Sequence, residues 1–231
     1  MQSSSTFWNK EYKRPRHLKL SDEPSADLVI FEAWMEKTMG EGIFNHLTLL
    51  DVGCGNGRNS LYLGNKYSMK GYGFDIAGEA IMQAKKLNPK GSGITYAIGD
   101  IAEPLPVSDG SIGLVLDLMT SHFLDEAGRE RYMKELVRVL EPRGVVLWKT
   151  FLKDEDIHST DLLKRYGTSE KNSYIHPKIG VQEHVFTEDE FRNYVEPHFT
   201  VEAIKRSHGH RTDDGRKGKR RYLVAYLSKK E

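Results

Sequence analysis

Short apolar runs alternate with helix-like segments along most of the chain. The apolar runs predict buried strands at residues 48–52, 70–74, 94–98, 112–117 and 145–151. Apolar residues at helical spacing predict helices between them, at residues 58–67, 78–87 and 126–140. This order of elements favours a parallel sheet with helices on both faces, which is an α/β fold.

The two ends of the chain extend this pattern. A helix with Leu28, Phe31 and Met35 on one face is predicted to begin after Ser25, a candidate N-cap. Thr187 and Glu190 form a predicted capping box for a second helix, which runs through residue 194. Residues 199–206 and 222–227 then read as a closing pair of strands.

The composition is that of a globular protein and argues against a membrane-spanning or secreted one. Of the 231 residues, 38% are apolar and 29% are charged, which is ordinary for a globular chain. No apolar stretch is long enough for a membrane span, and the first residues do not resemble a secretory signal. Cys54 is the only cysteine, so an internal disulfide is excluded. We expect a cytoplasmic protein that does not span a membrane.

A glycine-rich turn follows the first predicted strand, with the sequence LLDVGCGNGRN at residues 49–59. A dinucleotide fingerprint requires a third glycine where Arg58 stands, and Asp51 before the glycines would repel a pyrophosphate. Gly53, Gly55 and Gly57 alternate instead. This spacing disfavours NAD and a nicotinamide-dependent oxidoreductase.

Acidic residues end the next two strands. Asp75 follows the glycines by about twenty residues, the distance at which a carboxylate binds ribose hydroxyls. Asp100 and Ile101 follow the third strand and suit the edge and face of an adenine. An adenosine with a cationic tail fits these residues, and S-adenosylmethionine is such a ligand.

Five segments in this order resemble class I (Rossmann-like) S-adenosylmethionine-dependent methyltransferases. They are LLDVGCGNGRN, GYGFDIAGEAI, IGDIAEPLP, LVLDLMTSHF and ELVRVLEPRGVVLWKTF, within residues 49–152. The resemblance implies a doubly wound, mostly parallel sheet of seven strands, with the last strand antiparallel. It implies S-adenosylmethionine as cofactor, S-adenosylhomocysteine as product, and these binding residues: Asp51, Gly53, Cys54, Gly55 and Asn56 at the methionyl part, Asp75, Ile76, Asp100 and Ile101 at the adenosyl part, and Asp117 and Leu118 on the methyl-transfer side.

One domain over residues 1–231 is the simplest organisation. Its parts are an N-terminal arm and helix over the cofactor (1–45), a cofactor-binding half (46–152), a substrate-side insertion (153–186) and a closing helix with the final strand pair (187–231). The insertion is expected because a polar stretch of this length is unusual inside a compact α/β domain.

His122 is the candidate catalytic residue. Methyl transfer is an in-line displacement in which the protein mainly orients the reactants, so a base is needed only where the acceptor must first lose a proton. His122 lies five residues after Asp117, just past the end of a strand. A plain loop or capping histidine is the alternative interpretation.

Aromatic and histidine residues outside the motif are the candidate substrate contacts. Trp8 is expected to face the sulfonium through a cation–π contact and Tyr12 to face the substrate, although the two rings could equally anchor a terminal arm. In the insertion, Tyr174, His176 and His184 are predicted substrate contacts on a lid, with ordinary surface polarity as the alternative. Their spacing matches no zinc pattern, and no metal is predicted.

The C-terminal part is basic. Residues 205–230 contain ten Lys and Arg residues against Asp213 and Asp214, around a predicted hairpin tip. Nucleic acid is possible as a partner but disfavoured, because within the segment RSHGHRTDDGRKGKRRY, residues 206–222, only Tyr222 is available for stacking on bases. We expect methyl transfer to a small molecule, and the alternatives are methylation of RNA or protein through the basic hairpin, and a non-catalytic nucleoside-binding module. The sequence leaves the acceptor atom and the oligomeric state open.

Overall fold

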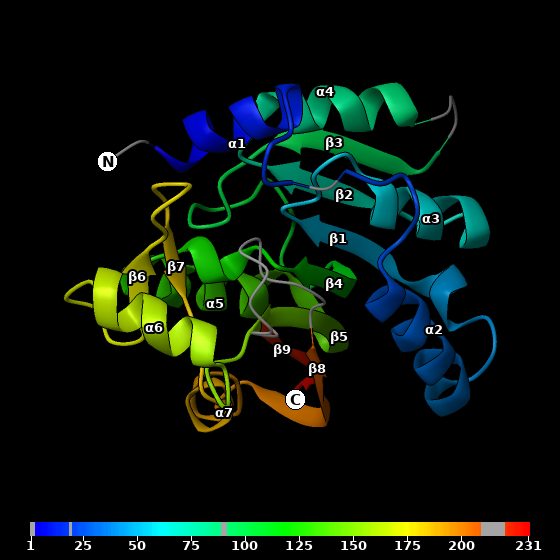
Figure 1. The fold of residues 1–231 in the computed structure, drawn as a ribbon. Coiled ribbons are helices and arrows are strands. Elements are labelled where there is room, and N and C mark those ends of the chain that lie inside the picture. The colour runs from blue at the N-terminus through cyan, green and yellow to red at the C-terminus, as the bar shows by residue number, and fades with distance from the viewer. Residues whose placement is uncertain (1–2, 19, 89–91, 209–219) are drawn as a thin grey trace.

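A seven-stranded sheet forms the centre of the computed structural model, which describes residues 3–18, 20–88, 92–208 and 220–231 (Figure 1). The strand order is β3-β2-β1-β4-β5-β9-β8. The strands are β1 (Thr48–Val52), β2 (Lys70–Asp75), β3 (Ile94–Ile98), β4 (Ile112–Leu118), β5 (Leu140–Phe151), β8 (Phe199–His208) and β9 (Arg221–Lys229). Strands β1 to β5 pair in parallel, and β9 runs antiparallel to both β5 and β8. The predicted Rossmann-like sheet with an antiparallel last strand is confirmed.

Helices cover both faces of the sheet. Helices α2 (Ala26–Met39), α3 (Arg58–Tyr67) and α4 (Gly78–Leu87) pack on one face, and α5 (Glu126–Val139) and α7 (Glu188–Val195) pack on the other. Because side chains alternate along a strand, Leu49 of β1 packs with the first group and Leu50 packs with the second. Both faces of the central strands are therefore buried, which explains their continuous apolar sequences.

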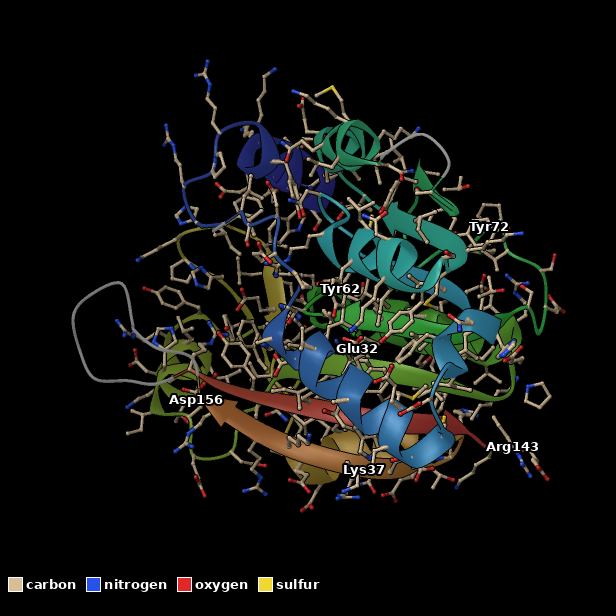
Figure 2. All side chains as sticks on the ribbon, turned by 90° about the vertical axis from the view of Figure 1, so that its right-hand side faces the viewer. Glu32, Lys37, Tyr62, Tyr72, Arg143 and Asp156 are labelled. Atoms are coloured by element: carbon tan, nitrogen blue, oxygen red, sulfur yellow. The ribbon has the colours of Figure 1, made fainter. Side chains whose placement is uncertain are left out.

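Helix α2 crosses one face of the sheet (Figure 2). Glu32 of α2 is buried and accepts a hydrogen bond from the Tyr62 hydroxyl of α3 at 2.7 Å, and Lys66 of α3 is its ion-pair partner. Ser25 occupies the predicted N-cap position, but its side chain makes no cap hydrogen bond. Its backbone N–H instead donates to Asn59 Oδ1 at 2.8 Å, which ties the start of α2 to α3.

The capping box at the start of α7 is confirmed. The Thr187 side chain accepts from the Glu190 N–H, and the Glu190 side chain accepts from the Thr187 N–H. Together the two bonds satisfy backbone donors that would otherwise have no partner in the first turn of the helix.

Residues 153–186 form regular structure, where the sequence predicted a polar lid. They contain helix α6 (Ile157–Tyr166) and a ribbon of β6 (Ser173–Ile175) and β7 (Gln182–His184). Asp156 caps α6 by accepting hydrogen bonds from the His158 and Ser159 amides. The described chain also contains α1 (Ser4–Lys13), which the hydrophobic pattern did not define, and the 3₁₀ turns η1 (Ile43–His46) and η2 (Ser121–Phe123).

The order of the strands reverses at β1, which lies between β2 and β4. Ligands of open parallel sheets bind at the carboxyl ends of the strands at such a point. No helix in the described ranges is both long and apolar enough to cross a membrane. The predicted hairpin tip at Asp213-Asp214-Gly215 lies outside the residues that the structure describes.

Candidate active site

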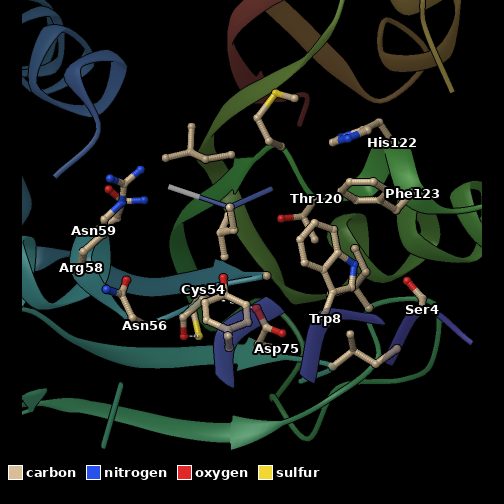
Figure 3. A pocket seen from close by; sticks show the side chains of 18 of the residues that line it. Ser4, Trp8, Cys54, Asn56, Arg58, Asn59, Asp75, Thr120, His122 and Phe123 are labelled. Atoms are coloured by element: carbon tan, nitrogen blue, oxygen red, sulfur yellow. Dashed lines mark hydrogen bonds between the residues drawn. The ribbon is translucent and has the colours of Figure 1, made fainter. Parts of the chain in front are cut away.

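A cavity of about 550 Å³ opens at the carboxyl ends of the central strands (Figure 3). This volume is in the range of small-molecule binding sites. Twelve of the seventeen predicted site residues line it: Trp8, Tyr12, Gly53, Cys54, Gly55, Asn56, Asp75, Ile76, Asp100, Ile101, Leu118 and His122. The five predicted residues outside its lining are Asp51, Asp117, Tyr174, His176 and His184.

The glycine turn needs glycine at its first two positions. Gly53 and Gly55 have φ of +65° and +59°, in the left-handed region that other residues adopt only under strain. A Cβ on Gly53 would collide with the Thr120 side chain, and a Cβ on Gly55 would collide with the Tyr12 hydroxyl. Glycine at these positions therefore lets Thr120 and Tyr12 pack directly against the turn.

Asp75 connects this turn to the end of β2. Its Oδ2 accepts a hydrogen bond from the Gly55 N–H at 2.9 Å, and its Oδ1 accepts one from the Ala77 N–H at 2.8 Å. Burial raises the pKa of this carboxyl, and the two backbone hydrogen bonds act against the rise. Each carboxylate oxygen can accept a second hydrogen bond, so Asp75 can still bind a ligand hydroxyl.

Asp51 and Asp117 lie behind the cavity wall. Both are fully buried at strand ends, and burial raises the pKa of Asp51 to about 7 and of Asp117 to about 6. Asp117 accepts hydrogen bonds from the Thr120 and Ser121 amides at 3.2 Å, so it shapes the turn after β4. Neither residue is part of the cavity lining, whereas Leu118, the neighbour of Asp117, is. The contacts of Asp51 and Asp117 with the cofactor stay predictions.

The N-terminal segment covers the cavity. Helix α1 is fixed to α4 by a hydrogen bond from the Glu79 N–H to Asn9 Oδ1 and one from Gln83 Nε2 to the Tyr12 carbonyl. Glu11 is buried and accepts hydrogen bonds from the amides of residues 16–18, which folds His17 and Leu18 against the cavity. Figure 3 shows Trp8 of this helix beside Phe123, at a ring-centroid distance of 5.0 Å.

The turn after the glycines is tied to the same covering segment. Asn56 Nδ2 donates to the Ser21 carbonyl at 3.0 Å, and Arg58 Nη1 donates to the Glu23 carbonyl at 3.2 Å. Arg58 therefore stands where a dinucleotide fingerprint has glycine, and its guanidinium is used to hold the chain over the cavity.

His122 is buried at the far end of the cavity, on η2. Burial lowers the pKa of its imidazole to about 3, with Glu183 acting against this fall and Arg220 and His184 adding to it. Neither ring nitrogen has a hydrogen-bond partner among the described residues. The imidazole is therefore neutral at physiological pH, with one donor and one acceptor available to a ligand.

Two further predicted substrate residues, Tyr174 and His184, lie outside the cavity lining. Tyr174 is fully buried and donates its hydroxyl to Glu183, which in turn pairs with Arg220. His184 is fully buried and bonded through Nδ1 to Ser173 Oγ at 2.8 Å. Tyr174 and His184 are buried on opposite faces of the β6–β7 ribbon and lie outside the cavity lining, and their contact with a substrate stays a prediction.

His176 lines a second cavity of about 210 Å³ next to the first. The two cavities share Trp8, His17, Leu18 and Phe123 in their walls. Within the described part of the chain there is no group of three or more His, Cys, Asp or Glu residues that could hold a metal ion.

Sequence reasoning missed several cavity residues, namely His17, Leu18, Thr120, Phe123, Phe151 and Tyr222. Phe151 is the last residue of a predicted strand, which was an available signal. Tyr222 belongs to β9, and its place became evident only from the pairing of β9 with β5.

Comparisons with known proteins agree on one family. A family described as "Methyltransferase domain" matches residues 50–148. The chain is 34% identical over 101 residues to 2-methyl-6-phytyl-1,4-hydroquinone methyltransferase of Synechocystis, covering 43% of this chain and 30% of that protein. It is 32% identical over 102 residues to ajmaline N-methyltransferase of Rauvolfia serpentina, covering 43% and 34%. The chain thus spans about a third of the length of these relatives.

Two solved structures extend the comparison over more of the chain. An S-adenosylmethionine-dependent methyltransferase of Methanosarcina mazei superposes with a TM-score of 0.66 at 25% identity, covering 80% of this chain and 92% of that one. The 1,6-didemethyltoxoflavin-N1-methyltransferase of Burkholderia thailandensis, solved with its substrate and S-adenosylhomocysteine, superposes with a TM-score of 0.68 at 17% identity, covering 98% and 87%. The second likeness concerns the fold.

Proposed function

Because the chain belongs to the class I S-adenosylmethionine-dependent methyltransferase family, we propose that it transfers a methyl group from S-adenosylmethionine to a small-molecule acceptor. The observation that carries this proposal is the cavity at the strand ends, which joins the glycine turn to a separate aromatic end. The bound cofactor supplies a methyl group on a positively charged sulfur.

The residues present fit this cofactor. The left-handed glycines let the Thr120 side chain and the Tyr12 hydroxyl approach the turn closely, and the turn itself lines the cavity, where we propose that the amino-acid tail binds. We propose that Asp75 accepts ribose hydroxyls and that Asp100 with Ile101 holds the adenine, since all three residues line the cavity. Arg58 stands where a dinucleotide fingerprint has its third glycine, which disfavours a ligand with a pyrophosphate.

The remaining cavity residues orient the acceptor and exclude water. Trp8 and Tyr12 of α1 close one side, and we propose that Trp8 also faces the sulfonium. His122 is proposed as the polar contact of the acceptor. Its pKa of about 3 makes it a weak base, so it serves better as a hydrogen-bond acceptor than as a proton sink.

A small acceptor is favoured over a macromolecule because the acceptor end is a cavity of small-molecule size, lined by Trp8, Phe123, His17 and Leu18. The names of the relatives point the same way, since they include a hydroquinone and the alkaloid ajmaline. Methylation of RNA or protein through the basic segment remains the alternative outcome of the experiment below. The single cysteine supports a cytoplasmic location.

Calorimetric titration tests the cofactor first. We expect S-adenosylmethionine and S-adenosylhomocysteine to bind and NAD not to bind. Tighter binding of NAD would overturn the proposed function. A protein that binds S-adenosylmethionine but transfers no methyl group to metabolite, RNA or protein fractions would be the non-catalytic nucleoside-binding module.

A further inference from the structure

An arc of rings forms the end of the cavity opposite the glycine turn. Trp8 contacts Phe123 at a centroid distance of 5.0 Å, and His122 contacts Phe123 at 4.0 Å and Phe151 at 4.7 Å. Phe151 stacks in turn on Tyr222 at 5.4 Å. The five rings come from α1, η2, β5 and β9, and all of them line the cavity.

Charged groups near this arc are already paired. The Arg220 guanidinium lies 3.6 Å from the Phe151 ring centroid, outside the cavity lining, and Arg220 Nη2 is 3.1 Å from Glu183 Oε2. Lys149 lies over the Tyr222 ring and forms an ion pair with Asp27 at 2.6 Å. The arc itself therefore consists of aromatic faces and a neutral imidazole.

The imidazole needs a partner that the described chain does not supply. His122 is 1% exposed, and both of its nitrogens are without hydrogen bonds. A buried polar group without a partner is unfavourable, so a ligand that donates a hydrogen bond to this ring is favoured. An N–H or O–H group next to the transferred methyl would meet this need.

The aromatic rings of the arc favour an N–H donor over an O–H donor. They attract a positive charge through the ring quadrupole, and a charge of that sign develops on a nitrogen acceptor during methyl transfer. An alcohol or phenol must lose its proton, and the neutral His122, facing Glu183, Arg220 and His184, is a poor base for that purpose. An amine already has a free electron pair.

We propose that the methyl acceptor is a neutral amine nitrogen held in the arc of Trp8, Phe123, Phe151 and Tyr222, with its N–H donated to His122. This inference rests on the proposed function. The amine electron pair forms the new N–C bond while the C–S bond breaks, and that bonding pair stays on sulfur. The ammonium product then releases its N–H proton to water.

Two probes of the same shape and different charge test this proposal. Phenyltrimethylammonium is a cation, and tert-butylbenzene is its neutral isostere. In calorimetric titrations of the protein saturated with S-adenosylhomocysteine, we expect the cation to bind about 2–30-fold more tightly, the range that cation–π contacts provide. Equal binding, or tighter binding of the neutral probe, would overturn the proposal.

Variants separate the aromatic effect from a loss of structure. Phe123→Leu and Phe151→Leu keep an apolar side chain but remove the ring, so the preference for the cation should fall while the affinity for S-adenosylhomocysteine is retained. Phe44→Leu is the matched control, because Phe44 is a buried ring that stacks on Tyr67 outside the cavity lining. An unchanged preference in both arc variants would contradict the proposal.

The outcomes for the two claims are distinguishable. Binding of S-adenosylhomocysteine without a preference for the cation overturns the amine acceptor and leaves the proposed function standing. Failure to bind S-adenosylhomocysteine overturns the proposed function and this inference with it.

Discussion

At the scale of single residues, Asp75 has both a structural role and a proposed ligand-binding role in the cavity. Its two oxygens already hold the backbone of the glycine turn and of residue 77, and a ribose hydroxyl would add a further bond. One side chain therefore both shapes the site and contacts the proposed ligand.

We predict that Asp75→Asn weakens the binding of S-adenosylmethionine by about 5–150-fold, because an unpaired polar contact costs roughly 1–3 kcal/mol. Calorimetric titration measures this change. Asp109→Asn is the matched control, since the Asp109 side chain is 80% exposed and forms an ion pair with Arg138 away from the cavity. The same affinity in wild type and Asp75→Asn would refute the placement of the ribose.

His122 gives a prediction about stability and pH. Burial holds its folded pKa at about 3, well below the unfolded value of about 6.5, so the unfolded state binds the proton first on acidification. Its contribution to stability is present above pH 6.5 and falls as the pH drops from about 6.5 toward 3. In urea unfolding, the free energy of unfolding should therefore fall more steeply with decreasing pH in the wild type than in His122→Gln. The difference in slope should be up to about 1.4 kcal/mol per pH unit. If the free energy of unfolding depended on pH in the same way in both proteins, His122 would not be held neutral in the folded state.

At the scale of elements, α1 is the cover of the cavity. It is fixed by hydrogen bonds to α4 and by the contact of Trp8 with Phe123, and it places two aromatic rings on the cavity wall. The strands of the central sheet pair with one another and do not depend on α1 for these pairings.

We predict that removal of residues 1–14 reduces the affinity for S-adenosylmethionine about tenfold or more while the helix and strand content of the remainder persists. Calorimetry and circular dichroism measure the two effects. Gln83→Ala loses only the hydrogen bond to the Tyr12 carbonyl and should give a smaller loss. Full affinity in the truncated protein would show that α1 does not cover the cofactor.

At the scale of the whole molecule, ligand binding should stabilise the folded state. At a concentration of 100 times its Kd, S-adenosylhomocysteine should contribute about 2.7 kcal/mol, which raises the Tm of a chain of this size by about 5–10 °C. Differential scanning fluorimetry measures the shift, with NAD at the same concentration as the control. A larger shift with NAD would contradict the cofactor assignment.

The sequence predicted the sheet well because its central strands are buried on both faces and read as continuous apolar runs. It also identified the glycine turn and Asp75, which are local features of a strand end. The ribbon at residues 173–184 escaped prediction because its strands are short and polar, with Glu183 buried against Arg220 and His184 buried beside Glu190.

The acceptor end could not be assembled from the sequence for a different reason. Phe123, Phe151 and Tyr222 are far apart along the chain and meet only because β4, β5 and β9 are neighbours in the sheet. The register of strand pairing decides on which face of the sheet each ring lies. A shift of one residue would move the ring to the opposite face.

Methyl transfer itself is the most direct test of the central claim. The protein is incubated with S-adenosylmethionine that carries a tritiated methyl group and with metabolite, RNA and protein fractions in parallel. We predict tritium in a small molecule of the metabolite fraction, with the incorporation reduced in Asp75→Asn. Incorporation into RNA or protein alone, or none in any fraction, would contradict the account.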